Sequence, residues 1–149
     1  MIVRRTIDLP CRIEETWTVL TRWERQADWM LDADSVVVRS PHRQGVGVRL
    51  DVRTRLFQIP AFVDPMEVVG WDPPRSLTIA HGGPVRGRGV WTLDPIERGT
   101  RFTWTEDVSL ETPVVGNLAA ALYAPIMRAL MGRAQRGLRS LIIASGPSA

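Results

Sequence analysis

The middle of the chain alternates apolar and polar residues with a period of two. Over residues 46–56 the even positions are mostly apolar and charged residues fill most of the odd ones, which is typical of a strand with one buried and one solvated face. Residues 77–81, 88–93 and 101–108 repeat the pattern, and residues 3–8 predict a short first strand. Turn-like sequences at 71–75, 81–84 and 97–100 connect these segments, so the chain predicts an antiparallel meander.

Helical spacing occurs on both sides of this meander. Ile13, Trp17 and Leu20 recur at helical intervals within residues 12–20, and a second helical stretch is predicted for residues 22–31. From residue 126 onward, apolar residues form one face of an amphipathic helix, namely Met127, Leu130, Met131, Ala134, Leu138 and Leu141. Pro125 removes a backbone donor, so we expect a kink near residues 121–125. The elements predict an α+β fold.

Length and composition indicate one folded domain over residues 1–149. The sequence is 44% hydrophobic and 23% charged, close to the average of globular proteins, and no linker or repeat divides it. Charged residues interrupt the N-terminal apolar stretch, and no segment has the length of a transmembrane helix. Cys11 has no second cysteine to pair with, so we expect a cytoplasmic location. The oligomeric state stays open.

The basic residues are all arginines. There are 19 of them against 16 acidic residues, giving a net charge of +3, which raises nucleic acid or an anionic membrane as a partner. The arginines are spread along the chain, and neither a groove-reading motif nor interleaved aromatic residues accompany them. We therefore expect an ordinary solvated surface and no specific nucleic-acid binding.

Several short phrases, in this order and spacing, resemble one family: Thr16-Trp17, Ala27-Asp28-Trp29-Met30, Trp71-Asp72-Pro73-Pro74-Arg75-Ser76-Leu77, Gly99-Thr100-Arg101 and Pro125-Ile126-Met127-Arg128. The chain resembles the polyketide cyclase/dehydrase and lipid-transport group of the START-like superfamily, also called SRPBCC or birch-pollen-allergen-like. The resemblance implies a helix-grip fold, in which a curved antiparallel sheet wraps around the C-terminal helix and encloses an apolar ligand cavity. The superfamily includes cyclases, lipid carriers and hormone receptors, and its cyclases have no short catalytic motif to carry over.

Familiar cofactor and metal signatures are missing. His42 and His81 have no histidine or cysteine neighbour at metal-ligand spacing. Gly45 and Gly47 lie in a strand pattern and lack the strand, turn and helix of a dinucleotide-binding loop. No serine occupies a nucleophile elbow. We expect neither a metal nor a cofactor.

Strand alternation assigns one face of the sheet to the cavity. A face that carries Leu50 and Val52 also carries Ile79, Trp91 and Trp104, by the same alternation. In the segment 62–71, Pro65 favours a bulge and leaves the facing ambiguous. The predicted ligand contacts are Trp29, Leu50, Val52, Met66, Val68, Ile79, His81, Trp91, Phe102, Trp104, Glu106, Tyr123, Ile126, Met127 and Leu130.

His81 and Glu106 are the candidate catalytic residues, because they share this face with large aromatic side chains. His81 either exchanges protons with a ligand or is a strand-end residue leading into a turn. Glu106 is either buried with a partner or a use, or reaches solvent or an arginine. Burial is expected to raise the pKa of Glu106 and to lower the pKa of His81.

The predicted aromatic contacts also have an alternative interpretation as residues of the hydrophobic core. Tyr123 either meets the ligand with its hydroxyl or is a core tyrosine with a backbone partner. Trp29, Trp91 and Trp104 are cavity wall if the resemblance holds and plain core on periodicity alone.

The function predicted first is binding, and possible carriage, of a hydrophobic or aromatic small molecule of lipid or polyketide type. The alternative is a cofactor-independent polyketide cyclase, aromatase or dehydratase, in which His81 and Glu106 exchange protons. A third hypothesis is a protein-interaction module that uses the arginine face of the last helix.

Overall fold

The computed structural model describes residues 1–56, 58–110 and 116–146. In chain order the elements are β1 (Ile2–Leu9), α1 (Ile13–Leu20), the 3-10 helix η1 (Trp23–Asp28), β2 (Ala33–Val38), β3 (Arg49–Leu56), β4 (Ile59–Asp72), β5 (Ser76–Gly82), β6 (Val85–Ile96), β7 (Gly99–Leu110) and α2 (Gly116–Ser145). This is the predicted helix-grip fold, an α+β arrangement of one sheet and one long helix.

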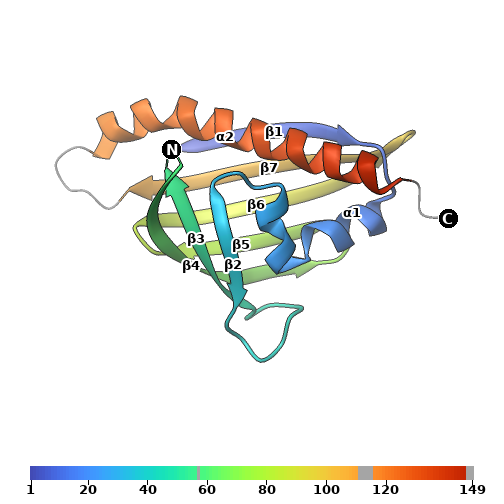
Figure 1. The fold of residues 1–149 in the computed structure, drawn as a ribbon, viewed down its shortest axis with the longest axis horizontal. Helices are drawn as coiled ribbons and strands as arrows, with labels where there is room; N and C mark the ends of the chain where they lie inside the picture. The colour runs from blue at the N-terminus through green and yellow to red at the C-terminus, as the bar shows by residue number, and fades with distance from the viewer. Residues whose placement is uncertain (57, 111–115, 147–149) are drawn as a thin grey trace.

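The strands form one seven-stranded sheet in the order β1-β7-β6-β5-β4-β3-β2. Every neighbouring pair is antiparallel, as the tight turns of the meander predict. The sheet curves, and α2 crosses it on the side of β1 and β7, while α1 and η1 lie towards the C-terminal end of α2 (Figure 1). Within the described residues, no helix has the length and apolar character needed to cross a membrane.

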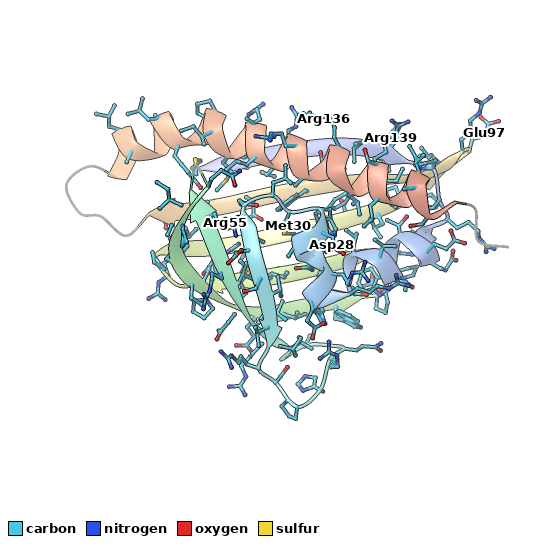
Figure 2. The ribbon with its side chains drawn as sticks, viewed as in Figure 1. Asp28, Met30, Arg55, Glu97, Arg136 and Arg139 are labelled. Carbon is cyan, nitrogen blue, oxygen red and sulfur yellow. The ribbon has the colours of Figure 1, made fainter. Side chains whose placement is uncertain are left out.

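The alternation predicted from the sequence sets which side chains are buried. Leu50 and Val52 of β3 are buried, as are Phe102 and Trp104 of β7. On α2, Met131, Ala134, Leu138 and Ile142 are buried at helical spacing, so one stripe of the helix docks on the sheet. Figure 2 shows Arg136 and Arg139 extending from α2 on its outer side.

Two tryptophan clusters pack in or against the core. The rings of Trp29, Trp91 and Trp104 pack together, with centroids 6.0 Å apart for Trp29 and Trp91 and 5.9 Å apart for Trp91 and Trp104. The second cluster is formed by Trp17, Trp23 and Trp71. The pairs Trp17–Trp71 and Trp91–Trp104 pack edge to face, an arrangement that stabilises aromatic pairs beyond the area they bury.

The structure corrects some predicted boundaries. β2 was not predicted, and β3 begins at Arg49 rather than at residue 46. Gly45 and Gly47 have φ angles of 95° and 91°, which belong to a loop and not to a strand.

Two irregularities were predicted, at Pro65 and near Pro125. The bulge predicted at Pro65 is wrong, because Pro65 pairs in register with Asp51 while the register shifts between Thr54 and Arg55 and between Val68 and Gly70. The kink predicted near residues 121–125 falls inside α2, which contains Pro125 within one continuous helix, and it stays a prediction.

Candidate functional site

A cavity of about 120 Å³ lies between the sheet and α2. Its wall is built by strands β2 to β7, by the segment before β2, and by one side of α2. Predicted ligand contacts on this wall are Val52, Met66, Ile79, His81, Trp91, Trp104, Glu106, Tyr123, Met127 and Leu130. Their location agrees with the predicted facing of the strands, and their role in ligand binding stays a prediction.

Other predicted contacts lie outside this wall. Trp29, Leu50, Val68 and Phe102 are buried in the core without lining the cavity. Ile126 on α2 is half-buried and does not line it either. The cavity occupies only part of the concave face, since tryptophan rings and aliphatic side chains fill the rest. The alternation along a strand predicts which face of the sheet a side chain lies on, but not whether its position along the strand is at the cavity.

Several lining residues were not predicted from the sequence. They are Gln26, Met30, Asp32, Ala33, Thr54, Phe62, Asp64, Val85, Gly89, Val108 and Met131. Asp64 could have been predicted from the alternation, because it lies two residues before Met66 on the same strand and therefore on the same face. No sequence pattern predicts the position of Asp32, since it precedes β2 in a turn without periodicity.

A hydrogen-bonded network of Asp64, His81 and Glu106 forms the polar part of the cavity wall. His81 on β5 lies between the two carboxylates, with Nδ1 2.7 Å from Asp64 Oδ2 and Nε2 3.1 Å from Glu106 Oε2. The Trp104 indole donates to Glu106 Oε1 at 2.5 Å, and the Gly83 N–H donates to Asp64 Oδ1 at 3.2 Å. Both carboxylates are buried, so each is compensated by hydrogen bonds as burial of a charge requires.

The two carboxylates reverse the predicted titration of His81. Burial alone would lower the pKa of His81, but the hydrogen bonds and charges of Asp64 and Glu106 raise it to about 9. The prediction of a lowered pKa is therefore wrong, because it considered burial without the partners. At neutral pH the site holds an imidazolium that donates from both ring nitrogens.

Glycines make room for the buried carboxylates. A Cβ atom at Gly89 would lie 2.7 Å from Glu106 Oε1, and one at Gly83 would lie 2.9 Å from Asp64 Oδ1. Both distances are shorter than ordinary contacts, so a side chain at either position would displace a carboxylate. The glycines on β6 and in the β5–β6 turn thus belong to the architecture of the network.

Asp32 and Tyr123 complete the ionisable groups of the wall. Burial raises the pKa of the Asp32 carboxyl, and the negative charge of Glu106 adds to this effect. Burial also raises the pKa of Tyr123, with Asp32 contributing. Asp32 and Glu106 therefore face the same small volume of low dielectric. Among the described residues, no group of His, Cys, Asp and Glu side chains is arranged to hold a metal ion.

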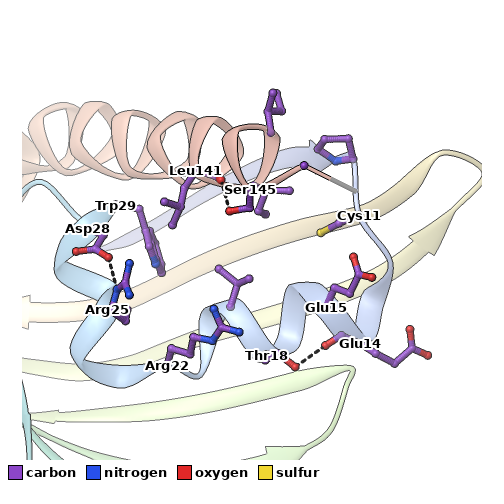
Figure 3. A pocket seen from close by; sticks show the side chains of 15 residues that line it. Cys11, Glu14, Glu15, Thr18, Arg22, Arg25, Asp28, Trp29, Leu141 and Ser145 are labelled. Atoms are coloured by element: carbon purple, nitrogen blue, oxygen red, sulfur yellow. Dashed lines mark hydrogen bonds and ion pairs between the residues drawn. The ribbon is translucent and has the colours of Figure 1, made fainter. Parts of the chain in front are cut away.

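A larger groove of about 650 Å³ lies elsewhere, between α1, η1 and the C-terminal end of α2 (Figure 3). Its floor includes Trp29 and Leu141, and its rim carries charged residues such as Arg25, which pairs with Asp28. The described residues that line this groove form no buried acid-base network. The smaller cavity is therefore the better candidate site despite its volume, because buried polar groups converge on its apolar wall.

A family profile matches most of the chain. The sequence profile of the family described as polyketide cyclase / dehydrase and lipid transport matches residues 1–142. No curated protein sequence matches the chain.

Solved structures share the fold at low sequence identity. TTHA0849 from Thermus thermophilus is 20% identical with a TM-score of 0.82, over 99% of this chain and 100% of that one. A START superfamily protein from Mycobacterium smegmatis is 16% identical with a TM-score of 0.71, over 96% of this chain and 97% of that one.

A third neighbour is a biosynthetic protein of two domains. The di-domain ARO/CYC StfQ of the steffimycin biosynthetic pathway is 10% identical with a TM-score of 0.77, and 97% of this chain matches 51% of that one. This chain thus spans about half of StfQ. From the profile match over residues 1–142 it follows that the chain belongs to the polyketide cyclase/dehydrase and lipid transport family.

Proposed function

We propose that the protein binds a hydrophobic or aromatic small molecule of lipid or polyketide type in the cavity under α2. The observation that carries this proposal is the cavity itself, whose wall is mainly apolar and aromatic with a few convergent polar groups. Membership of a family described by polyketide and lipid ligands supports it. A lone, half-buried cysteine, Cys11, accords with a cytoplasmic site of action.

The methionine side chains of the wall can repack and so allow ligands larger than the cavity to bind. The volume of about 120 Å³ is close to that of a cavity that takes up one benzene ring, roughly 150 Å³. A longer lipid or polyketide therefore has to displace side chains. Every methionine of the chain except Met1 lines the cavity, and unbranched thioether side chains repack at low cost.

Binding can be measured with the neutral fluorescent probe N-phenylnaphthylamine. We expect one saturable site in the unmodified protein. Leu130→Trp fills the cavity, because Leu130 lies on its wall, and should abolish binding. Leu122→Trp is the matched control, since Leu122 is on the same helix, is 66% exposed and does not line the cavity. Equal probe affinity in the two folded variants would exclude the cavity as the binding site.

The cofactor-independent cyclase or dehydratase remains the second candidate function, and the His81 network favours it. An imidazolium and a carboxylate on one apolar wall are the pair that a dehydration needs. His81 would donate its proton to the leaving hydroxyl group, which departs as water, while Glu106 accepts the proton from the adjacent carbon.

Diacetone alcohol is a β-hydroxy ketone small enough for the cavity, and its dehydration gives a conjugated enone that absorbs ultraviolet light. Turnover that is lost in His81→Gln and kept in His42→Gln would support the enzyme. His42 is the matched control because it lies in the loop before β3, where it contacts the Val46 carbonyl. No turnover above the rate in buffer would leave binding as the function.

A further inference from the structure

The charge of the cavity is opposite to the charge of the whole protein. The chain carries 19 arginines and a net charge of +3. None of the described residues that line the cavity is an arginine, whereas Asp32, Asp64 and Glu106 all line it. The carboxylates are therefore concentrated at the cavity, although the chain as a whole is basic. A ligand that enters the cavity meets negative charge.

The His81 network neutralises only part of this charge. One imidazolium shared by Asp64 and Glu106 leaves that network with one net negative charge. The Trp104 indole and the Gly83 amide donate hydrogen bonds to the same carboxylates, but they add no positive charge. The network therefore keeps a negative potential towards the cavity, where the low dielectric strengthens it.

Asp32 adds a third carboxylate to the wall, where His81 is the one basic residue among the described lining residues. Arg55 donates its backbone N–H to the Asp32 carbonyl, while its side chain pairs with Asp34. The one positive charge among the described lining residues, on His81, is thus already shared by Asp64 and Glu106, which accept the hydrogen bonds of both its ring nitrogens and leave none for Asp32.

We propose that the preferred ligand carries an ammonium group on a single apolar ring or short apolar chain, and that the ammonium binds between Asp32 and Glu106. This inference rests on the proposed binding function and specifies the ligand class of the same cavity. The apolar part contacts the tryptophans and methionines of the wall. Three carboxylates and one imidazolium leave two negative charges on the wall. The ammonium compensates one of them, and a buried charge is costly unless it is paired.

Three ligands of one shape test the proposal: benzylamine, benzyl alcohol and benzoate, titrated by calorimetry at neutral pH. We expect benzylamine to bind at least about tenfold more tightly than benzyl alcohol, which corresponds to about 1.4 kcal/mol, and benzoate not to bind. Benzyl alcohol binding as tightly as benzylamine would overturn the amine preference and leave the proposed binding function intact. Failure of all three ligands and of N-phenylnaphthylamine would overturn both.

Asp32→Asn locates the charge that recognises the ammonium. It should reduce benzylamine affinity to that of benzyl alcohol and leave benzyl alcohol affinity unchanged. Asp34→Asn is the matched control, because Asp34 lies two residues away, pairs with Arg55 and does not line the cavity, so it should change neither affinity. A tenfold preference for benzylamine over benzyl alcohol that persists in Asp32→Asn would overturn the assignment to this carboxylate. The comparison of the three ligands on the unmodified protein does not depend on whether the variant folds.

Discussion

His81 is held as an imidazolium because two buried carboxylates accept hydrogen bonds from its two ring N–H groups. The side chain is only 11% exposed, and the hydrogen bonds with Asp64 and Glu106 outweigh the cost of burial, giving a pKa of about 9. The chain has two histidines, so an NMR titration of the imidazole signals is simple to assign. We expect one signal to titrate near pH 9, and we expect His42→Gln to leave that signal in place. A signal of His81 that titrates below its ordinary pKa of 6.5 would contradict the bridged geometry.

The same shift predicts how stability depends on pH. A raised pKa means that the folded state binds the proton more tightly than the unfolded chain does. The stabilisation is therefore fully present below pH 6.5 and is lost as the pH rises to about 9. It amounts to about 3 kcal/mol, from about 1.36 kcal/mol per pKa unit. Urea unfolding between these pH values measures it, and His81→Gln should lack this pH-dependent loss.

Glu106→Gln separates the charge of Glu106 from its shape. The amide still accepts a hydrogen bond from Trp104 but leaves the imidazolium with one carboxylate fewer. We expect unfolding free energy to fall by about 3 kcal/mol, as for other broken buried ion pairs, and the pKa of His81 to fall. Asp107→Asn is the control, because Asp107 is the next residue on β7 and is exposed. Equal stability of the two variants would mean that the pair contributes nothing to the fold.

At this scale the sequence predicted the face of each residue but not its partners. Alternation along β5 and β7 placed His81 and Glu106 on the cavity side, where the structure has them. Asp64 followed from the same parity, but Pro65 obscured it. The direction of the His81 pKa shift could not follow from burial alone, because it depends on a carboxylate 17 residues away in the chain.

Gly87 is essential to the pairing of β6 with β7. Its φ angle is 138°, and a Cβ atom there would lie 2.1 Å from the Asp107 carbonyl oxygen. Gly87→Ala therefore requires the strands to separate, and we expect a loss of at least about 3 kcal/mol in unfolding free energy. Gly45→Ala is a matched control with a φ of 95° and open space around it, so it should cost only about 1 kcal/mol of backbone strain. Similar losses in the two variants would show that strain, and not the contact, is the cause.

The elements themselves were predictable where their periodicity was long. The strands that form the centre of the sheet and the amphipathic part of α2 match their predicted segments within a few residues. β2 was missed because Val36, Val37 and Val38 are consecutive and show no alternation, and because the strand gains its structure by pairing with β3. Tertiary pairing of this kind is not encoded in a local pattern.

The whole molecule presents arginines of two kinds. Several pair with carboxylates on the surface, as Arg39 does with Asp51 and Arg101 with Asp8. Others gather in a groove of about 560 Å³ that contains Arg5, Arg128, Arg133 and Arg136. This groove offers a diffuse positive charge with no aromatic side chain among its described lining residues, so it lacks the features that read a base sequence.

We expect duplex DNA to bind this surface weakly and without sequence preference. Binding measured by fluorescence anisotropy should fall steeply as salt increases from roughly 50 to 200 mM, because release of condensed counterions drives such contacts. Arg128→Ala with Arg136→Ala should weaken all sequences equally. Binding to one sequence that persists at high salt would contradict this expectation.

The methionine wall of the cavity also makes the site sensitive to oxidants. Conversion of Met30, Met66, Met127 or Met131 to the sulfoxide places a strong dipole where the wall is now apolar and deformable. Peroxide that reaches the cavity would therefore lower its affinity for apolar ligands and leave the Asp64, His81 and Glu106 side chains unmodified. A molecule already inside would shield the sulfur atoms, so the rate of methionine oxidation reports whether the cavity is occupied.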